Sequence, residues 1–322
     1  MTEKLGGLAA RFVQHRRALG RKYHSEEREL RLLVRFAEAH GIHRLDQLTA
    51  VSLENFLASR PRQRPRSFNH LLGVIRCFLD WAVIQELLTV SPLHVRRRRV
   101  TAGRLPFIFD VVQARRLLAA AATLPDNSRA QQRGPTYRVI FALCYGLGLR
   151  AAEACGLRLG DVDTDRSLLL VRGGKFGKSR LVPHGPRIAE LVGAQVQRRL
   201  AAHTQSDPAA PLFSFDGRRC VHPGTASQTF HALVRSLGLA IPDGVSPPRL
   251  HDLRHSFAVG CLLRWYREGL DPASRLQHLS TFMGHVDPTS TAVYLGITSG
   301  LLGQANRRFE AFAEPAWAEA DS

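Results

Sequence analysis

Arg150 and Glu153 form the first group of residues whose types and spacing could do chemistry. They lie in the segment Tyr-Gly-Leu-Gly-Leu-Arg-Ala-Ala-Glu, whose glycines at 146 and 148 interrupt a helix. Arg150 is therefore expected to begin a new helix, where its guanidinium can project and offer a fork of donors to a phosphate. Glu153 follows three residues later on the same helix face and could hold Arg150 by an ion pair. Taken alone, the segment also fits an ordinary salt bridge at a helix start.

The segment Leu-His-Asp-Leu-Arg-His, residues 250–255, places two histidines beside a second arginine. His251 and Arg254 are three residues apart and share a helix face, and His255 follows His251 at the i+4 position. The two histidines also have the spacing of a zinc-protease helix, but that motif needs a glutamate after the first histidine. Asp252 stands there, and a cation shares the face. We therefore expect no metal at this segment.

A histidine and a tyrosine follow near the end of the chain. Gly284 and Pro288 frame His285 and predict a turn or a helix end. Tyr294 comes nine residues after His285. A tyrosine in such a setting is also typical of a half-buried core position.

Two short apolar runs, residues 167–172 and 179–183, flank a turn that carries Lys175 and Lys178. Turn residues between such runs predict a β-hairpin. Together, the four segments supply cations, histidines and a tyrosine, but no Asp/Glu cluster of the kind that two metal ions need. This set suits a phosphodiester attacked by a side-chain nucleophile. Cations would hold the non-bridging oxygens as charge builds up, and the tyrosine would form a covalent phosphoryl intermediate.

The order of these elements resembles the tyrosine recombinase (phage integrase) superfamily. G-L-R-x-x-E is followed by a hairpin lysine, H-x-L-R-H, G-H and a tyrosine nine residues further on, all within residues 146–294. Residues 69–92, with Trp81 and a closing Ser-Pro, resemble the helical core-binding domain of that family. The resemblance therefore covers nearly the whole chain.

The resemblance implies a role for each candidate residue. Tyr294 would be the nucleophile that forms a 3′-phosphotyrosine link. Lys175, with Lys178 as the alternative, would protonate the 5′-oxygen leaving group. His251 would be the base for the tyrosine hydroxyl or a hydrogen-bond donor to the phosphate. The implied catalytic set is Arg150, Lys175, His251, Arg254, His285 and Tyr294, and the implied supporting residues are Glu153, Lys178 and His255.

The resemblance also implies partners and cofactors. The partner would be double-stranded DNA, bound by a homo-tetramer that joins two duplexes, and neither a metal ion nor ATP would be needed as a cofactor. It leaves open whether a partner recombinase or a DNA-bending protein takes part, and whether the outcome is integration, transposition or resolution. The segment 309–317 would dock on a neighbouring protomer or form an ordinary terminal helix.

The elements that must position these residues are mostly helical. Apolar residues recur at three- and four-residue steps in residues 5–95, which predicts four or five helices. The last of them is expected to be capped by Ser67 or Asn69 and to end by Ser91-Pro92. Further helices are predicted over residues 110–122 and 139–147, with polar loops over 124–137 and 241–248.

Composition and charge divide the chain and point to its partner. The 322 residues are 44% apolar and carry a net charge of +18, of which +11 falls in residues 1–104. Such a balance favours nucleic acid. We predict a helical core-binding DNA-binding domain with a SAM-like fold (1–95), a basic linker (96–106) and an α+β catalytic domain with a C-terminal tail (107–322). The fold class is mainly α with a small β-hairpin or sheet. The linker arginines that are expected to contact phosphates are Arg96, Arg97, Arg98 and Arg99.

Several function classes are disfavoured. The first residues lack an apolar signal core, no apolar run approaches a membrane span, and five cysteines without paired spacing indicate no disulfide framework. We expect a cytoplasmic, nucleoid-associated protein that does not bind membranes. Two alternatives to recombination stay open: relaxation of DNA in the manner of type IB topoisomerases, and an idle DNA-binding or architectural protein on a recombinase scaffold.

Overall fold

The chain divides into two compact units, Met1–Gly103 and Arg104–Ser322, which we call the first unit and the second unit. The computed structural model describes residues 4–100, 105–173, 179–202, 207–284, 294 and 303. Each unit has a hydrophobic core of its own.

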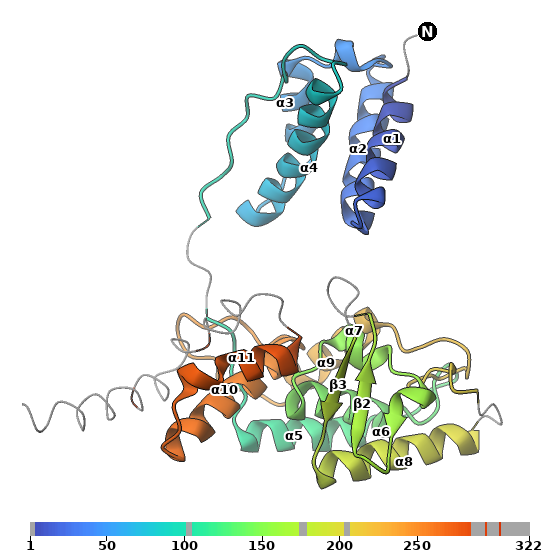
Figure 1. Cartoon of the computed structure of the whole chain (residues 1–322), viewed down its shortest axis with the longest axis vertical. Coiled ribbons are helices and arrows are strands. Elements are labelled where there is room, and N and C mark those ends of the chain that lie inside the picture. Colours follow the sequence, from blue (N-terminus) through green and yellow to red (C-terminus); the bar gives the residue numbers. More distant parts are fainter. Residues whose placement is uncertain are drawn as a thin grey trace, which may run out of the picture. The chain divides into compact units, whose positions relative to one another are not determined.

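The first unit is a bundle of helices (Figure 1). Its core contains aromatic side chains. The ring centroid of Phe12 lies 5.6 Å from that of Phe78 and 5.4 Å from that of Trp81. The prediction of four or five helices in this region is confirmed. They are α1 (Leu5–Ala18), α2 (His24–Ala39), α3 (Ala50–Ala58) and α4 (Pro65–Ile84), with a short 3-10 turn at Leu45–Gln47.

Helix α4 differs from its predicted bounds at both ends. It begins at Pro65, a residue suited to the first helical position, and neither Ser67 nor Asn69 caps it. It ends at Ile84, well before Ser91. The N–H of Leu87 bonds to the carbonyl of Ala82, and the residue between helix and loop, Glu86, is left-handed. This is a Schellman ending built without glycine, so no residue type in the sequence signals it.

Helix α4 is also long and apolar enough, by length and composition, to cross a membrane. Half of that apolar window is buried inside the first unit, and the buried positions include Leu72, Ile75 and Phe78. A core helix of a folded domain has the same composition, and the packing of α4 identifies it as one.

The start of the predicted linker is attached to α4. The side-chain amide of Asn69 donates to the carbonyl of Arg98 and accepts from its N–H, both at 2.8 Å. The Arg98 guanidinium lies 3.9 Å from the ring centroid of Phe68, and Arg76 donates to the carbonyl of Val95. The arginine run therefore belongs to the first unit rather than to a free linker. The far end of the predicted linker belongs to the second unit, where Leu105 forms a parallel bridge with Val245.

The second unit combines helices with one small sheet (Figure 1). The predicted hairpin is confirmed, because β2 and β3 pair antiparallel with Val171 opposite Arg180, and β1 adds a third strand on the other side of β2. Sequence patterning missed β1, which is only two residues long. The elements are α5 (Val111–Ala122), α6 (Arg133–Gly146), α7 (Ala151–Cys155), a 3-10 turn (Leu159–Asp161), β1 (Val162–Asp163), β2 (Leu168–Val171), β3 (Arg180–Pro183), α8 (Pro186–Ala202), α9 (Pro223–Ser236), α10 (Asp252–Arg267) and α11 (Pro272–Met283).

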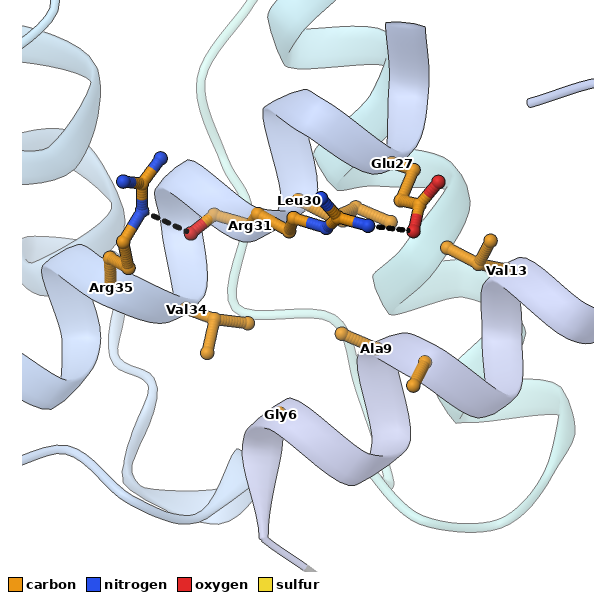
Figure 2. Close-up of a pocket in the computed structure, with 9 residues that line it drawn as sticks. Gly6, Ala9, Val13, Glu27, Leu30, Arg31, Val34 and Arg35 are labelled. Atoms are coloured by element: carbon orange, nitrogen blue, oxygen red, sulfur yellow. Dashed lines mark hydrogen bonds and ion pairs between the residues drawn. The ribbon is translucent and has the colours of Figure 1, made fainter. Parts of the chain in front are cut away.

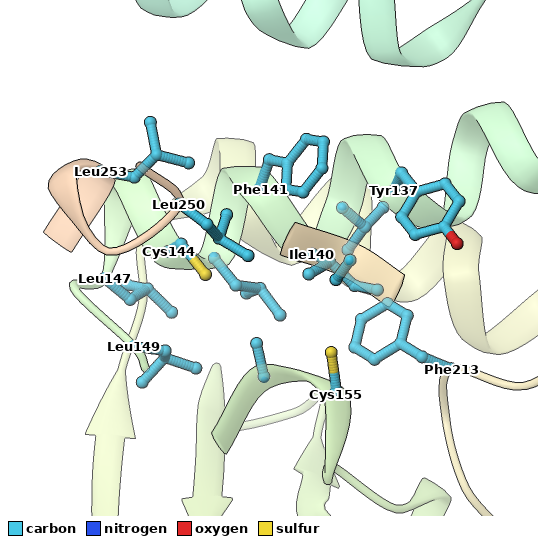
Figure 3. Close-up of a cluster of buried hydrophobic side chains, with 14 of the residues drawn as sticks. Tyr137, Ile140, Phe141, Cys144, Leu147, Leu149, Cys155, Phe213, Leu250 and Leu253 are labelled. Carbon is cyan, nitrogen blue, oxygen red and sulfur yellow. The ribbon is translucent and has the colours of Figure 1, made fainter. Parts of the chain in front are cut away.

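Helix α6 runs through the core of the second unit and contacts α5, α8 and α10. Figure 3 shows its side chains meeting others from α7, from the loop before α9 and from the start of α10 with the turn before it: Tyr137, Ile140, Phe141, Cys144, Cys155, Phe213, Leu250 and Leu253. The expected loop over 124–137 is wrong at its end, because α6 begins at Arg133. Thr136 and Tyr137 are buried, so packing extends the helix into a stretch whose glycine and proline suggested a loop. The predicted fold class, mainly α with a small sheet, is confirmed.

Candidate active site

Glu153 is the centre of a network of arginines in the second unit. Helix α7 begins at Ala151 with Arg150 as its N-cap residue, as the glycine pattern predicts. One oxygen of Glu153 accepts from the backbone N–H of Arg150 at 3.0 Å, and the other accepts from Nη1 of Arg150 at 2.6 Å. The side chain of Glu153 is only 6% exposed. The spacing Arg-x-x-Glu thus builds a cap that fixes the direction of the arginine.

A second arginine on the same carboxylate, Arg180, is one that no sequence motif singled out. It lies at the start of β3, and its two terminal nitrogens donate to the two oxygens of Glu153 at 3.1 and 2.9 Å. Its Nε donates to the carbonyl of Phe282 at the end of α11, at 2.9 Å. An arginine at the head of an apolar strand was the available signal, because such a side chain needs a buried anionic partner.

Arg254 is almost fully buried, with 1% of its surface exposed. Its Nη1 donates to the carbonyl of Gly148, and its Nη2 donates to the carbonyl of Met283 at 2.8 Å. Gly148 has φ +62, and a Cβ there would lie 2.5 Å from the Phe257 ring. Burial and the charge of Arg150 lower the pKa of Arg254 to about 10, so it remains a cation at neutral pH. The Gly-Leu-Gly-Leu-Arg segment is therefore joined to α10 by a buried positive charge.

The pKa of the glutamate reflects the same network. Burial would raise the pKa of Glu153, but donation from Arg180 and from the backbone of Arg150 lowers it to about 2. Glu153 is thus an anion throughout the physiological range. One negative charge is shared among arginines from α7, β3 and α10, since Nη1 of Arg254 also lies 3.9 Å from it. The cluster keeps an excess positive charge, which favours an anionic ligand.

Three aromatic rings lie in contact beside this cluster. The hydroxyl of Tyr294 is 2.8 Å from Nδ1 of His255, and their ring centroids are 5.4 Å apart. The ring centroids of His255 and His251 are 4.7 Å apart in an edge-on arrangement. Tyr294 is 3% exposed, and the positive charges of Arg254 and Arg150 both act on it. The structure therefore brings together Arg150, Glu153, His251, Arg254, His255 and Tyr294.

Desolvation sets the protonation states of these rings. Burial, with the neighbouring cations Arg249 and Arg254, lowers the pKa of His255 to about 4. Partial desolvation, followed by His255 and Arg254, likewise lowers the pKa of His251 to about 4. Burial raises the pKa of Tyr294 despite the two arginines. In this conformation both histidines are neutral and the tyrosine is protonated at pH 7.

The remaining predicted catalytic residues, Lys175, Lys178 and His285, lie outside the described residues. The chain neighbour of His285 is part of the site, because Gly284 closes α11 with φ +69 and its carbonyl accepts from Nη2 of Arg150 at 3.2 Å. The candidate DNA-binding arginines Arg96–Arg99 belong to the first unit.

Among the described residues, no three His, Cys, Asp or Glu side chains cluster as metal ligands. A cavity of about 550 Å³ lies in the first unit between α1 and α2 (Figure 2). Small and apolar side chains such as Ala9 and Val34 line it, and the Arg31–Glu27 pair closes one side. It shares no residue with the arginine, histidine and tyrosine site of the second unit.

Comparison with known protein sequences gives a consistent family. Protein y4rB of Sinorhizobium fredii, named as an integrase/recombinase, is 35% identical over 306 residues, which cover 93% of this chain and 95% of that protein. Tyrosine recombinase XerA of Thermococcus kodakarensis is 34% identical and covers 76% of this chain and 75% of its own. Tyrosine recombinase XerC of Xanthomonas campestris pv. campestris is 29% identical and covers 83% of this chain and 76% of its own.

Solved structures share the fold. The integrase of the Tn1549 transposon in complex with a circular intermediate DNA has a TM-score of 0.67 at 18% identity, covering 97% of this chain and 100% of that one. A lambda integrase dimer bound to a core site has a TM-score of 0.63 at 16% identity, covering 90% and 77%. The model of the phage integrase family matches residues 109–299, which hold every described catalytic candidate. The chain therefore belongs to the phage integrase family of tyrosine recombinases and is a site-specific recombinase.

Proposed function

We propose that this recombinase cleaves and rejoins DNA strands through a 3′-phosphotyrosine intermediate formed by Tyr294. The observation that carries the proposal is the position of the Tyr294 hydroxyl, held by His255 within the field of Arg150 and Arg254. A phenol oxygen beside two fixed cations can attack a phosphodiester, because those cations stabilise the negative charge that builds up on the phosphate.

Arg150 and Arg254 have different roles in this conformation. The side chain of Arg150 is 26% exposed, so part of its guanidinium can bind a phosphate directly. Arg254 is 1% exposed, and its Nη1 and Nη2 donate to the carbonyls of Gly148 and Met283. Its charge acts through the protein interior, where low polarity strengthens it. Glu153 and Arg180 hold Arg150 in place for this contact.

The reaction follows from these groups. Oη of Tyr294 forms a bond to phosphorus as the bond from phosphorus to the 5′-oxygen breaks. The hairpin lysine, Lys175 or Lys178, gives a proton to that leaving oxygen, and the family resemblance assigns His285 to the position beside the phosphate. Attack by a 5′-hydroxyl of another strand reverses the step and releases the tyrosine. The phosphotyrosine link keeps the energy of the broken bond, so the scheme needs neither ATP nor a metal ion.

The partner in this scheme is double-stranded DNA, bound by a homo-tetramer, with a partner recombinase or a DNA-bending protein as a further component where the site requires it. Solved relatives of the same fold are bound to DNA, one of them as a dimer. The net charge of +18 supports binding to a polyanion, and binding should weaken steeply with salt. The proposed location is the cytoplasm, on the nucleoid.

The test is recovery of covalent protein–DNA adducts from expressing cells under denaturing conditions, with the attached DNA sequenced. Wild-type protein should give adducts at a defined site. Tyr294→Phe should give none, while it still retains DNA under native conditions. An adduct recovered from Tyr294→Phe would refute the assignment of the nucleophile. No adduct from either protein, with DNA still bound natively, would favour an architectural role.

A further inference from the structure

His255 contacts the hydroxyl of Tyr294, the oxygen proposed to react. Its Nδ1 lies 2.8 Å from the hydroxyl of Tyr294, and its side chain is 19% exposed. The hydroxyl can donate only to an unprotonated ring nitrogen, and the neutral state of His255 provides one. In that arrangement the ring proton of His255 is on Nε2, on the opposite edge.

The opposite edge of the ring faces a buried carboxylate. Nε2 of His255 is 3.8 Å from Oδ1 of Asp252, whose surface is fully buried. Asp252 is itself fixed by the backbone N–H of Arg249 at 2.8 Å and by its guanidinium at 3.0 Å. Because the first turn of α10 carries both Asp252 and His255, the carboxylate and the ring keep their spacing as the site works.

We propose that Asp252, His255 and Tyr294 form a proton relay in which His255 accepts the tyrosine proton during attack. This inference rests on the proposed phosphotyrosine mechanism and adds its base. The bond from Oη to hydrogen breaks and the proton moves to Nδ1, while Oη forms its bond to phosphorus. The leaving 5′-oxygen takes its proton from the separate lysine acid. Asp252 stabilises the imidazolium through Nε2, which frees His251 to donate to the phosphate.

The charges around His255 fit this role. Burial, together with the charges of Arg249 and Arg254, keeps it neutral in the free protein, and His251 packs on its edge. A bound phosphate adds negative charge that favours the imidazolium. His255 is therefore unprotonated before DNA binds and becomes a stronger base once the phosphate is in place.

The experiment measures the rate of adduct formation by the full chain on a nicked duplex carrying the site identified from cellular adducts. His255→Gln should lower the rate at pH 7 by about 10²- to 10⁴-fold, the range for loss of a general base. The rate of the variant should then rise with pH as hydroxide replaces the base. 3,5-Difluorotyrosine has a phenol that ionises near neutral pH. Placed at position 294 of His255→Gln, it should raise the rate of adduct formation at least tenfold.

The rescue separates a base from a structural role. The same fluorinated residue should not rescue Arg150→Ala, whose defect lies in holding the phosphate. His278→Gln, an exposed histidine of α11, should match the wild type. A wild-type rate for His255→Gln would overturn the relay, and so would a loss that neither pH nor the fluorinated tyrosine relieves while the melting temperature is unchanged. Absence of adducts from the wild type would instead reject the phosphotyrosine mechanism, and the relay with it.

Discussion

The guanidinium of Arg180 is paired with the carboxylate of Glu153 through two parallel hydrogen bonds of 3.1 and 2.9 Å. This pair joins the β-hairpin to the helix that begins with Arg150. Because Nε of Arg180 also holds the carbonyl of Phe282, the same side chain fixes the end of α11. One arginine therefore connects the segments that carry the hairpin lysines, Arg150 and His285.

Replacing Arg180 should disturb the site without removing any residue that contacts DNA. In Arg180→Met, Glu153 loses two charge-assisted hydrogen bonds, at a cost of about 1.5–3 kcal/mol in the free energy of unfolding. Arg150 should lose its fixed direction, so the rate of adduct formation should fall while the salt dependence of DNA binding stays the same. Urea denaturation and adduct assays measure the two effects.

Arg31→Met is the matched control, because Arg31 also pairs with a glutamate, Glu27, but on the exposed surface of the first unit. Its effect on the free energy of unfolding should be much smaller than that of Arg180→Met, because solvent screens an exposed pair. Equal destabilisation by the two substitutions would contradict the central position assigned to Arg180.

The two arginines proposed as catalytic, Arg150 and Arg254, should differ in their effect on stability. Arg150→Ala removes a partly exposed side chain, so folding should survive while cleavage falls by orders of magnitude. Arg254→Ala empties a buried position and leaves the carbonyls of Gly148 and Met283 without their donors, which should cost on the order of 3 kcal/mol. Thermal unfolding of both variants checks this. A melting temperature of Arg254→Ala equal to that of Arg150→Ala would count against the buried role.

Motif spacing located the arginine, histidine and tyrosine residues of the site, because each motif is short and lies on one element. Arg150 caps its helix and is paired with Glu153 as the i, i+3 rule predicts. What spacing could not locate is Arg180, since its partner lies 27 residues away and only the strand register turns it toward Glu153. Nor could spacing decide which histidine faces Tyr294, because His251 and His255 share one helix face.

The bounds of helices and strands could be predicted where local contacts decide them and not where distant contacts do. The hairpin strands follow from local patterning and were placed within a residue. The end of α4 depends on a left-handed Glu86, which carries no glycine signal, and the start of α6 depends on the burial of Tyr137 in a distant core. The arginine run at 96–99 has the composition of a free linker, because the amide of Asn69 that holds it is remote in sequence.

Gly148→Ala should damage the site through the backbone. The left-handed φ of Gly148 disfavours any side chain, and the new Cβ would lie 2.5 Å from the ring of Phe257. The carbonyl that accepts from Arg254 would have to move. We expect destabilisation of about 1–3 kcal/mol and a large loss of adduct formation, measured by thermal unfolding and adduct assay. Gly185→Ala, a position with open space around it, should change neither.

Stability should fall in acid in two stages. The folded pKa values of His251 and His255, about 4, lie below the ordinary value of 6.5, so the unfolded chain binds more protons between these values. Their contribution is present above pH 6.5 and is lost as the pH falls toward 4. Glu153, with a folded pKa of about 2, adds a further loss below about 4.5. Melting temperatures measured from pH 7.5 to 3.5 should show the first stage. In His255→Gln, the melting temperature should change less steeply with pH in this stage.

Among the arginines at 96–99, Arg98 should differ from Arg96 and Arg99 in DNA binding. Arg98 is held by Phe68 and by the carbonyl of Arg62, so its guanidinium is already used within the first unit. Arg96, Arg98 and Arg99 are all exposed, so the contacts of Arg98 with Phe68 and Arg62 make the difference. Each phosphate contact contributes about 0.9 to the slope of log affinity against log salt, so Arg96→Ala with Arg99→Ala should lower that slope by about 2. Arg98→Ala should leave the slope nearly unchanged and instead lower the melting temperature. A drop of the slope by about 1 in Arg98→Ala, with unchanged stability, would show that Arg98 leaves Phe68 to bind phosphate.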